Sequence, residues 1–134
     1  MTTAALAGVD VRVMIAPGGE ELSPAYRAGM TYAAALARAG VQVLLYRGAY
    51  FHSKTICVDS RFCSIGSANI DIRSFSINYE TNLVVYDETV TRELERDFFD
   101  DLEQCHVFIA DDYDAMKVSS RLVDSMMRLG SPLI

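Results

Sequence analysis

The sequence predicts an α/β domain in which helices flank a mixed β-sheet. Valine and isoleucine alternate with other residues along residues 9–15, as in a half-buried strand. An alanine-rich helical segment over residues 24–40 follows, and then a second apolar strand over residues 41–46. With 134 residues, of which 51% are hydrophobic, the chain can bury one ordinary core. We therefore expect a single domain.

Local signals set the limits of the first elements. Residues 4–7 are typical of the end of a helix, and residues 17–19, Pro-Gly-Gly, predict a loop. Ser23 is the expected N-cap of the alanine-rich helix, and Pro24 suits its first helical position. Gly40 is a natural stop for this helix. The order helix, strand, helix, strand is typical of an α/β layer.

The middle of the chain predicts a strand pair and a covering helix. Residues 55–58 and 62–65 are short apolar runs joined by Asp-Ser-Arg at residues 59–61, which indicates a hairpin. Residues 77–86 are expected to add the rest of the mixed sheet. Apolar residues recur at four-residue spacing along residues 89–104, which predicts a helix with one buried face.

The C-terminal region predicts helices without a metal site. Three aspartates within residues 111–114 lack the glycine and the terminal glutamate of a calcium loop, so we expect a helix N-cap there. A helical stripe with basic residues beside it follows: Val118, Leu122, Met126 and Leu129, near Lys117, Arg121 and Arg128. This stripe suits either a membrane surface or packing on a domain or partner.

Composition narrows the class of protein. The net charge of −6 disfavours a non-specific nucleic-acid binder and leaves a lipid headgroup possible. The three cysteines, Cys57, Cys63 and Cys105, are odd in number and lack metal-ligand spacing. We therefore expect reduced, structural thiols, which suits a protein on the cytosolic side of the membrane. No run approaches the roughly 20 apolar residues of a membrane span, and residues 1–3 open no signal or transit peptide. We expect the chain as written to be soluble.

Polar side chains around the predicted hairpin suit a phosphodiester substrate. His52 and Lys54 are two residues apart and project from one face if the strand is extended. Antiparallel pairing would return Gly66, Ser67 and Asn69 to the end of the sheet that carries His52. Gly66 lets the backbone approach an oxyanion, and the Ser67 hydroxyl and Asn69 amide can donate hydrogen bonds to it. No acidic cluster accompanies them, so neither a metal nor another cofactor is expected.

This pattern resembles the phospholipase D superfamily. His52-x-Lys54 is followed after four residues by Asp59, and after six more by Gly-Ser-x-Asn. The resemblance continues through residues 70–75 and 78–82, and more weakly through residues 131–134, and is closest to the C-terminal catalytic half of a bacterial cardiolipin synthase. It implies a phospholipase D-type half-domain over residues 1–110, truncated at its N-terminus, and a C-terminal helical segment over residues 111–134.

The resemblance also implies roles for the site residues. His52 would be the nucleophile that forms a covalent phospho-imidazole, and Lys54 would stabilise charge on the phosphate oxygens. Asp59 belongs to the motif and is expected to support the site structurally. Glu80 would bond a catalytic imidazole, either His52 or the histidine of another motif copy. Arg73 suits a second phosphate or headgroup contact as well as a structural ion pair.

The implied reaction is transfer of a phosphatidyl group to a hydroxyl of phosphatidylglycerol or a similar lipid, which yields cardiolipin and releases glycerol. One histidine attacks and a second acts as acid and base, so the second half-domain must come from the parent chain or a dimer mate. His106 has no such neighbours and is expected to be an ordinary solvated residue. Related synthases carry membrane spans and a first motif copy, so we expect a C-terminal fragment of a protein on the cytoplasmic side of the bacterial cell membrane.

Three functions remain open at this point. The first is a fragment of a lipid phosphatidyltransferase, favoured by residues 70–75 and 78–82. The second is a phospholipase D-like phosphodiesterase or nuclease whose site is built across a homodimer. The third is a catalytically silent half-domain. The acidic balance and the start of the chain argue against the nuclease, and the intact motif argues against the silent half-domain.

Overall fold

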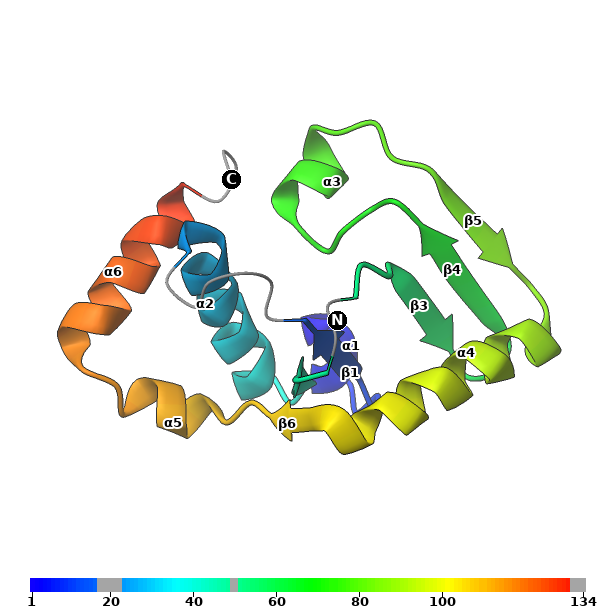
Figure 1. Cartoon of the computed structure of the whole chain (residues 1–134), viewed down its shortest axis with the longest axis horizontal. Coiled ribbons are helices and arrows are strands. Elements are labelled where there is room, and N and C mark those ends of the chain that lie inside the picture. Colours follow the sequence, from blue (N-terminus) through cyan, green and yellow to red (C-terminus); the bar gives the residue numbers. More distant parts are fainter. Residues whose placement is uncertain (17–22, 49–50, 131–134) are drawn as a thin grey trace. The chain divides into compact units, whose positions relative to one another are not determined.

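The computed structural model describes residues 1–16, 23–48 and 51–130 (Figure 1). The predicted loop at residues 17–19 and the weak family match at residues 131–134 lie outside the described residues. The chain divides into two compact units. Unit 1 combines Met1–Tyr50 with Gln104–Ile134, and unit 2 is the continuous segment Phe51–Glu103.

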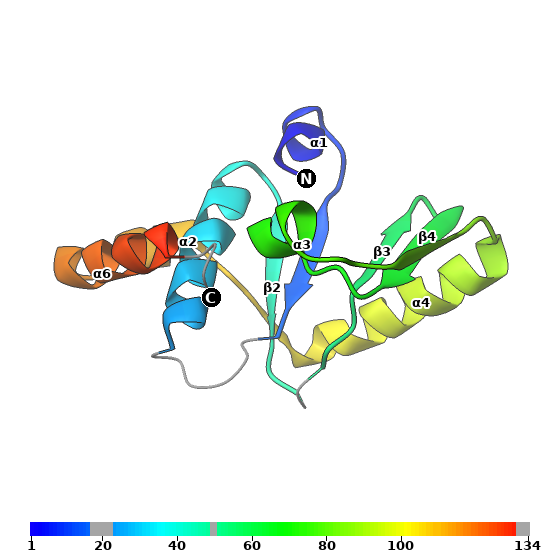
Figure 2. The ribbon, with the colours of Figure 1, turned by 90° about the horizontal axis from the view of Figure 1, so that it is seen from above.

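Unit 1 contains a mixed three-stranded sheet and most of the helices. Its elements are α1 (Thr2–Leu6), β1 (Arg12–Ile15), α2 (Pro24–Arg38), β2 (Gln42–Tyr46), β6 (Cys105–Val107), α5 (Ala110–Asp114) and α6 (Val118–Leu129). The strand order is β1-β2-β6. β1 pairs in parallel with β2, with Val13 opposite Val43, and β6 pairs antiparallel with β2, with His106 opposite Leu45. α2 lies alongside β2 (Figure 2).

The ends of α2 follow the sequence signals. The Ser23 hydroxyl accepts the Tyr26 N–H across 3.2 Å, and Pro24 occupies the first helical position, where a missing N–H costs no helical bond. Gly40, just past the helix, has a φ of 89°, a conformation that glycine adopts without strain. The buried face of α2 packs on β2 through Ala33 and Val43. The predictions for this helix are confirmed.

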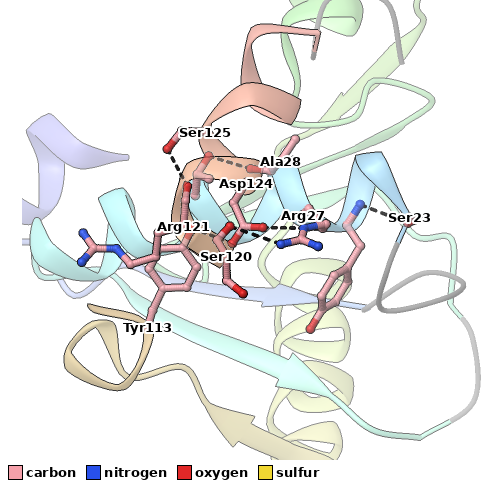
Figure 3. A network of polar contacts seen from close by, with 10 residues as sticks. Ser23, Arg27, Ala28, Tyr113, Ser120, Arg121, Asp124 and Ser125 are labelled. Atoms are coloured by element: carbon pink, nitrogen blue, oxygen red, sulfur yellow. Dashed lines mark hydrogen bonds and ion pairs between the residues drawn. The ribbon is translucent and has the colours of Figure 1, made fainter. Parts of the chain in front are cut away.

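A buried polar cluster joins α2, α5 and α6 (Figure 3). Asp124 accepts one bond from Arg27 Nε at 2.5 Å and one from the Tyr113 hydroxyl at 3.0 Å. Arg27 also donates to the main-chain oxygen of Ser120. Because both carboxylate oxygens of Asp124 have a donor, its burial is compensated. The cluster fixes which face of α6 lies against α2.

Unit 2 is an antiparallel sheet with one long helix. Its elements are β3 (Thr55–Val58), β4 (Phe62–Gly66), α3 (Ile72–Ser76), β5 (Asn82–Val85), α4 (Glu88–Asp101) and the start of a 3₁₀ turn (Leu102–Gln104). The strand order is β3-β4-β5. In the antiparallel register Cys57 lies opposite Cys63, and Cys63 lies opposite Val85. α4 runs along β3 and β4 (Figure 2), where Cys63 and Thr91 are fully buried.

The α/β architecture with flanking helices agrees with the sequence prediction, but the arrangement of the strands differs. The described strands form two three-stranded sheets instead of one. In unit 2 consecutive strands pair with each other, whereas in unit 1 β6 pairs with β2, which lies much earlier in the sequence. The strand expected over residues 77–86 is limited to Asn82–Val85, and the helix expected to reach residue 104 ends at Asp101. Among the described helices, none has the length and apolar character needed to cross a membrane.

Candidate active site

The β3–β4 hairpin places the glycine of the motif beside its lysine. Thr55 pairs with Ile65, and the Gly66 N–H donates to the Lys54 carbonyl across 3.1 Å. The return of the second strand to the His52 end of the sheet is therefore as predicted. β3 begins only at Thr55, however, so His52 and Lys54 precede the strand instead of sharing one of its faces.

Lys54 and His52 lie at the open end of this hairpin. The Lys54 ammonium donates to the main-chain oxygen of His52 at 2.9 Å. The His52 side chain is exposed, and Lys54 is half-buried. An exposed imidazole is able to act as a nucleophile, and a lysine two residues away is able to neutralise charge on a phosphate oxygen.

Glu80 collects three hydrogen bonds at the same end of unit 2. The Ser67 hydroxyl donates to Oε2 at 2.5 Å, and Asn78 Nδ2 and the Ser74 hydroxyl donate to Oε1 at 3.2 and 3.3 Å. The Ser67 bond, followed by those of Asn78 and Ser74 and by the charge of Lys54, lowers the pKa of Glu80 below its ordinary value. Glu80 is therefore an ionised carboxylate near neutral pH.

The Ser67 hydroxyl is committed to the protein's own groups. It donates to Glu80 and accepts the Thr81 N–H at 3.0 Å, while the Ser67 N–H donates to the Thr81 carbonyl at 3.0 Å. Next to it, the Ala68 N–H donates to Asn82 Oδ1 at 3.3 Å. Donation from this hydroxyl to a substrate oxygen therefore requires its bond to Glu80 to exchange.

Gly66 serves the packing of the two neighbouring strands. A Cβ built on Gly66 would collide with the side-chain amide of Asn82 and with the Thr81 carbonyl oxygen. The sequence suggested that a bare backbone admits an oxyanion here. In the structure the space is taken by the residues at the start of β5, so glycine is required before any ligand is considered.

The short helix α3 supports the Gly-Ser-x-Asn segment from the other side. Asp71 caps α3 by accepting the Ser74 N–H at 2.7 Å, and the buried Ser74 hydroxyl accepts the Asn69 N–H at 3.1 Å. Arg73 lies within α3, and its carbonyl accepts the N–H groups of Ile77 and Asn78.

Sequence reasoning missed Ser74 as a member of the site. Its hydroxyl links the Asn69 backbone to Glu80. The available signal was the spacing of Asp71 and Ser74, which is that of an N-cap and the third residue of a helix.

Asp59 lies at the opposite end of β3 from Lys54. The four residues of β3 lie between them, and the five steps from Lys54 to Asp59 span roughly 16 Å of extended chain. Asp59 and Ser60 form the turn with φ values of 51° and 54°, closed by the Arg61 N–H on the Val58 carbonyl. Glu95 of α4 accepts both the N–H and the hydroxyl of Ser60, at 3.0 and 2.5 Å.

The geometry therefore brings Lys54, Gly66, Ser67 and Glu80 to one end of unit 2 and leaves Asp59 at the other. His106 belongs to β6 of unit 1 and is exposed. Within the part of the chain that the structure describes, no group of three histidine, cysteine or acidic side chains is placed to hold a metal ion.

Comparisons with known proteins are consistent about the family. The model of the family described as "Cardiolipin synthase, PLD-like domain" matches residues 1–102. The cardiolipin synthase of Clostridium perfringens (strain SM101) is 40% identical over 131 residues, which cover 98% of this chain and 27% of that protein. Cardiolipin synthase 2 of Bacillus cereus is 40% identical over 134 residues, covering 100% and 26%. The chain thus spans about a quarter of the length of these relatives.

Two solved structures share the fold. Nuc of Salmonella typhimurium, a phospholipase D family member, superposes with a TM-score of 0.68 at 22% identity, over 80% of this chain and 69% of that one. The phosphatidylserine synthase of Haemophilus influenzae superposes with a TM-score of 0.66 at 14% identity, over 98% of this chain and 35% of that one.

Proposed function

Since this chain belongs to the cardiolipin synthase family of phospholipase D-like domains, as its motif predicted, we propose that it supplies one half of a phosphatidyltransferase site. The observation that carries the proposal is the end of the β3–β4 hairpin. There Lys54 accepts a bond from the Gly66 N–H, and its positive charge helps to lower the pKa of Glu80. The exposed His52 is two residues from Lys54. These groups can receive a phosphodiester without a metal ligand set.

In the proposed reaction His52 is the nucleophile. Its unprotonated ring nitrogen attacks phosphorus, the bond from phosphorus to the leaving alcohol breaks, and that alcohol takes a proton from a second histidine. The second histidine then removes a proton from the incoming alcohol, whose oxygen attacks the phosphohistidine and frees His52. Lys54 offsets the charge that grows on the non-bridging oxygens.

Glu80 is proposed as the carboxylate that stabilises a protonated imidazole. Its three hydrogen bonds favour the ionised form that this role needs. The imidazole is that of His52 or that of the second histidine. Asn69 and Arg73 are proposed to contact the phosphate or headgroup, Ser67 joins them when its bond to Glu80 exchanges, and Asp59 supports the hairpin turn.

The proposed substrate is phosphatidylglycerol or a similar phospholipid, and the acceptor is a lipid hydroxyl. We propose that the second histidine belongs to another half-domain, in a longer chain or in a dimer mate, at the cytoplasmic face of a bacterial membrane. In this scheme residues 1–110 form the half-domain and residues 111–134 a helical addition. The net charge of −6 argues against nucleic acid as the substrate.

The test compares this chain alone with a longer protein that also carries a second His-x-Lys half-domain. Both are incubated with phosphatidylglycerol vesicles, and cardiolipin and glycerol are measured. We expect both products from the longer protein and little or none from the chain alone. Robust turnover by the chain as a monomer, on phosphatidylglycerol or on DNA, would contradict the half-site.

A phosphodiesterase or nuclease built across a homodimer is the second candidate. The similarity in fold and length to Nuc is the observation that favours it. A two-fold axis repeats the same surface on both partners and can bring two copies of His52 together. Light scattering with assays on DNA separates the candidates, because an active dimer supports the nuclease-like reading. Inactivity in every assembly would support the silent half-domain.

A further inference from the structure

The outer face of α6 carries an apolar stripe that nothing in the described structure covers. Val118, Leu122, Met126 and Leu129 are 79%, 60%, 61% and 84% exposed. Their spacing puts them on one side of a helix with about 3.6 residues per turn. Asp124, on the other side, is 4% exposed. We refer to these four residues as the α6 stripe.

The polar cluster on the inner face keeps the stripe outward. Asp124 accepts bonds from Arg27 of α2 and from Tyr113 of α5 (Figure 3). Rotation of α6 to bury the stripe would separate this buried pair and leave a charge without a partner, which costs several times more than an exposed ion pair contributes. The stripe is therefore available to a partner outside the described residues.

Basic side chains gather along one edge of the stripe. A groove of about 390 Å³ is lined by Arg38, Arg121 and Arg128 together with Val118 and Leu122 of the stripe. Arg38 and Arg121 both pair with a single carboxylate, Asp114, so the groove keeps a surplus of positive charge. Arg128 stacks over the Tyr32 ring, with its guanidinium carbon 4.4 Å from the ring centre.

The acidic groups near α6 do not cancel this charge at the groove. The only carboxylate within α6 is the buried Asp124, which is paired with Arg27. The exposed Asp111 and Asp112 belong to α5 and are absent from the groove lining. In a chain of net charge −6, a cationic edge beside an apolar stripe is a local departure from the average.

We propose that α6 binds the surface of an anionic phospholipid bilayer. The α6 stripe enters the boundary between headgroups and acyl chains, and the arginines of the groove bind lipid phosphates. An outward apolar face with cations along its edge is the composition of a helix that lies in a membrane interface. The charge complementarity favours an anionic membrane over a neutral one, and the exposed apolar stripe beside the cations favours a membrane over an acidic protein surface. The proposal concerns unit 1 and does not depend on the transfer reaction.

The chain contains no tryptophan, so a single introduced indole reports on one position. Leu129→Trp places the indole on the α6 stripe. Leu6→Trp is the control and places it on α1. Both leucines are exposed, Leu129 by 84% and Leu6 by 73%. Fluorescence is measured with vesicles of phosphatidylcholine alone and with phosphatidylglycerol added. We expect a blue shift for Leu129→Trp with the anionic vesicles only. No shift, or an equal shift for Leu6→Trp, would overturn the proposal.

A second pair of variants tests the cations. In the Leu129→Trp background, Arg121→Gln with Arg128→Gln removes two arginines of the groove and should weaken binding to the anionic vesicles roughly fivefold for each charge removed. Arg92→Gln with Arg96→Gln removes two exposed charges from α4 and should change binding little. Equal weakening by both pairs would overturn the assignment to α6. A blue shift that appears without vesicles and follows dimer formation in light scattering would assign the stripe to a second copy instead.

Discussion

The Ser67 hydroxyl donates to Glu80 Oε2 across 2.5 Å, although the two residues are 13 positions apart in the chain. This bond closes the segment between β4 and β5 into a loop with its polar groups at one end. Because the same hydroxyl accepts the Thr81 N–H, the position of Ser67 depends on both sides of the loop. Ser67 therefore lowers the pKa of Glu80 and also helps to hold the shape of the loop.

Ser67→Ala should raise the pKa of Glu80 toward the ordinary value of a glutamate, because the Ser67 bond is the largest cause of its depression. The bonds to Glu80 stabilise the fold fully above the ordinary carboxyl pKa, and this stabilisation is lost as pH falls through the lowered pKa. Asn78→Ala should raise the pKa less, and Ser76→Ala should leave it unchanged. NMR titration of the Glu80 carboxyl carbon measures all three. A larger rise for Asn78→Ala would contradict the assigned order.

His52→Ala should abolish turnover in the active assembly, because no other group of this half-site is proposed to form the bond to phosphorus. His52→Asn should give the same loss with the fold retained, as circular dichroism can check. His106→Ala is the matched control, since it changes an exposed histidine of unit 1, and it should keep activity. Activity of His52→Ala within about tenfold of wild type on phosphatidylglycerol would remove the assignment.

Gly66→Ala should destabilise the chain by about 1–3 kcal/mol, because its Cβ meets the backbone oxygen of Thr81, which cannot move aside as a side chain can. Gly29→Ala is the control. Gly29 lies in α2 with open space around its Cβ position, so the change should stabilise by up to about 1 kcal/mol. Urea unfolding gives both values. Equal effects of the two substitutions would refute the steric argument.

Asp59→Gly should leave stability within about 0.5 kcal/mol of wild type, because glycine adopts the φ of 51° freely. Asp59→Ala should cost about 1 kcal/mol, since alanine is strained in that conformation. Thermal unfolding measures both. The variants also distinguish a structural role of Asp59 from a catalytic one. If Asp59→Gly is stable but inactive, the carboxylate takes part in catalysis and the purely supporting role is wrong.

Asp124→Ala should destabilise unit 1 by about 3 kcal/mol or more, because Arg27 would keep a half-buried charge without its partner. Replacing both, as Arg27→Met with Asp124→Leu, should recover most of the loss, since no unpaired charge remains. Tyr113→Phe removes one bond to Asp124 and should cost about 1 kcal/mol. Denaturant unfolding of the variants tests the series. A double variant as unstable as Asp124→Ala would argue against an unpaired charge as the cause.

Elements that depend on neighbouring residues were predictable from the sequence. β3 was expected at the residues where it is found, and β4 extends one residue past its expected end, because apolar runs and turn residues are local signals. The start of α2 at Pro24 follows equally from the residues that cap it. The register that sets Gly66 beside Lys54 then follows from the hairpin alone.

Features that depend on distant contacts were not predictable. α3 has only five residues, and its cap and its bond to Glu80 hold it in place, so it has no periodic pattern to detect. β6 has three residues and pairs with β2 from the far end of the sequence. The division of the strands between two sheets depends on pairings between distant segments, such as that of β6 with β2. The role of Ser74 was also not predictable, because it depends on the hydrogen bond that its hydroxyl makes to Glu80 in the folded chain.

The path of the chain through the two units has a consequence for the order of folding. Unit 2 is one uninterrupted segment whose strands pair with their neighbours in sequence, so each connection that must close lies within this segment. The bond between Arg27 and Asp124 in unit 1 spans 97 positions. During synthesis, α2 must therefore wait for α6 while unit 2 can already pair its strands. Until α6 emerges from the ribosome, the face of α2 that later holds Asp124 is open to chaperones and to other nascent chains.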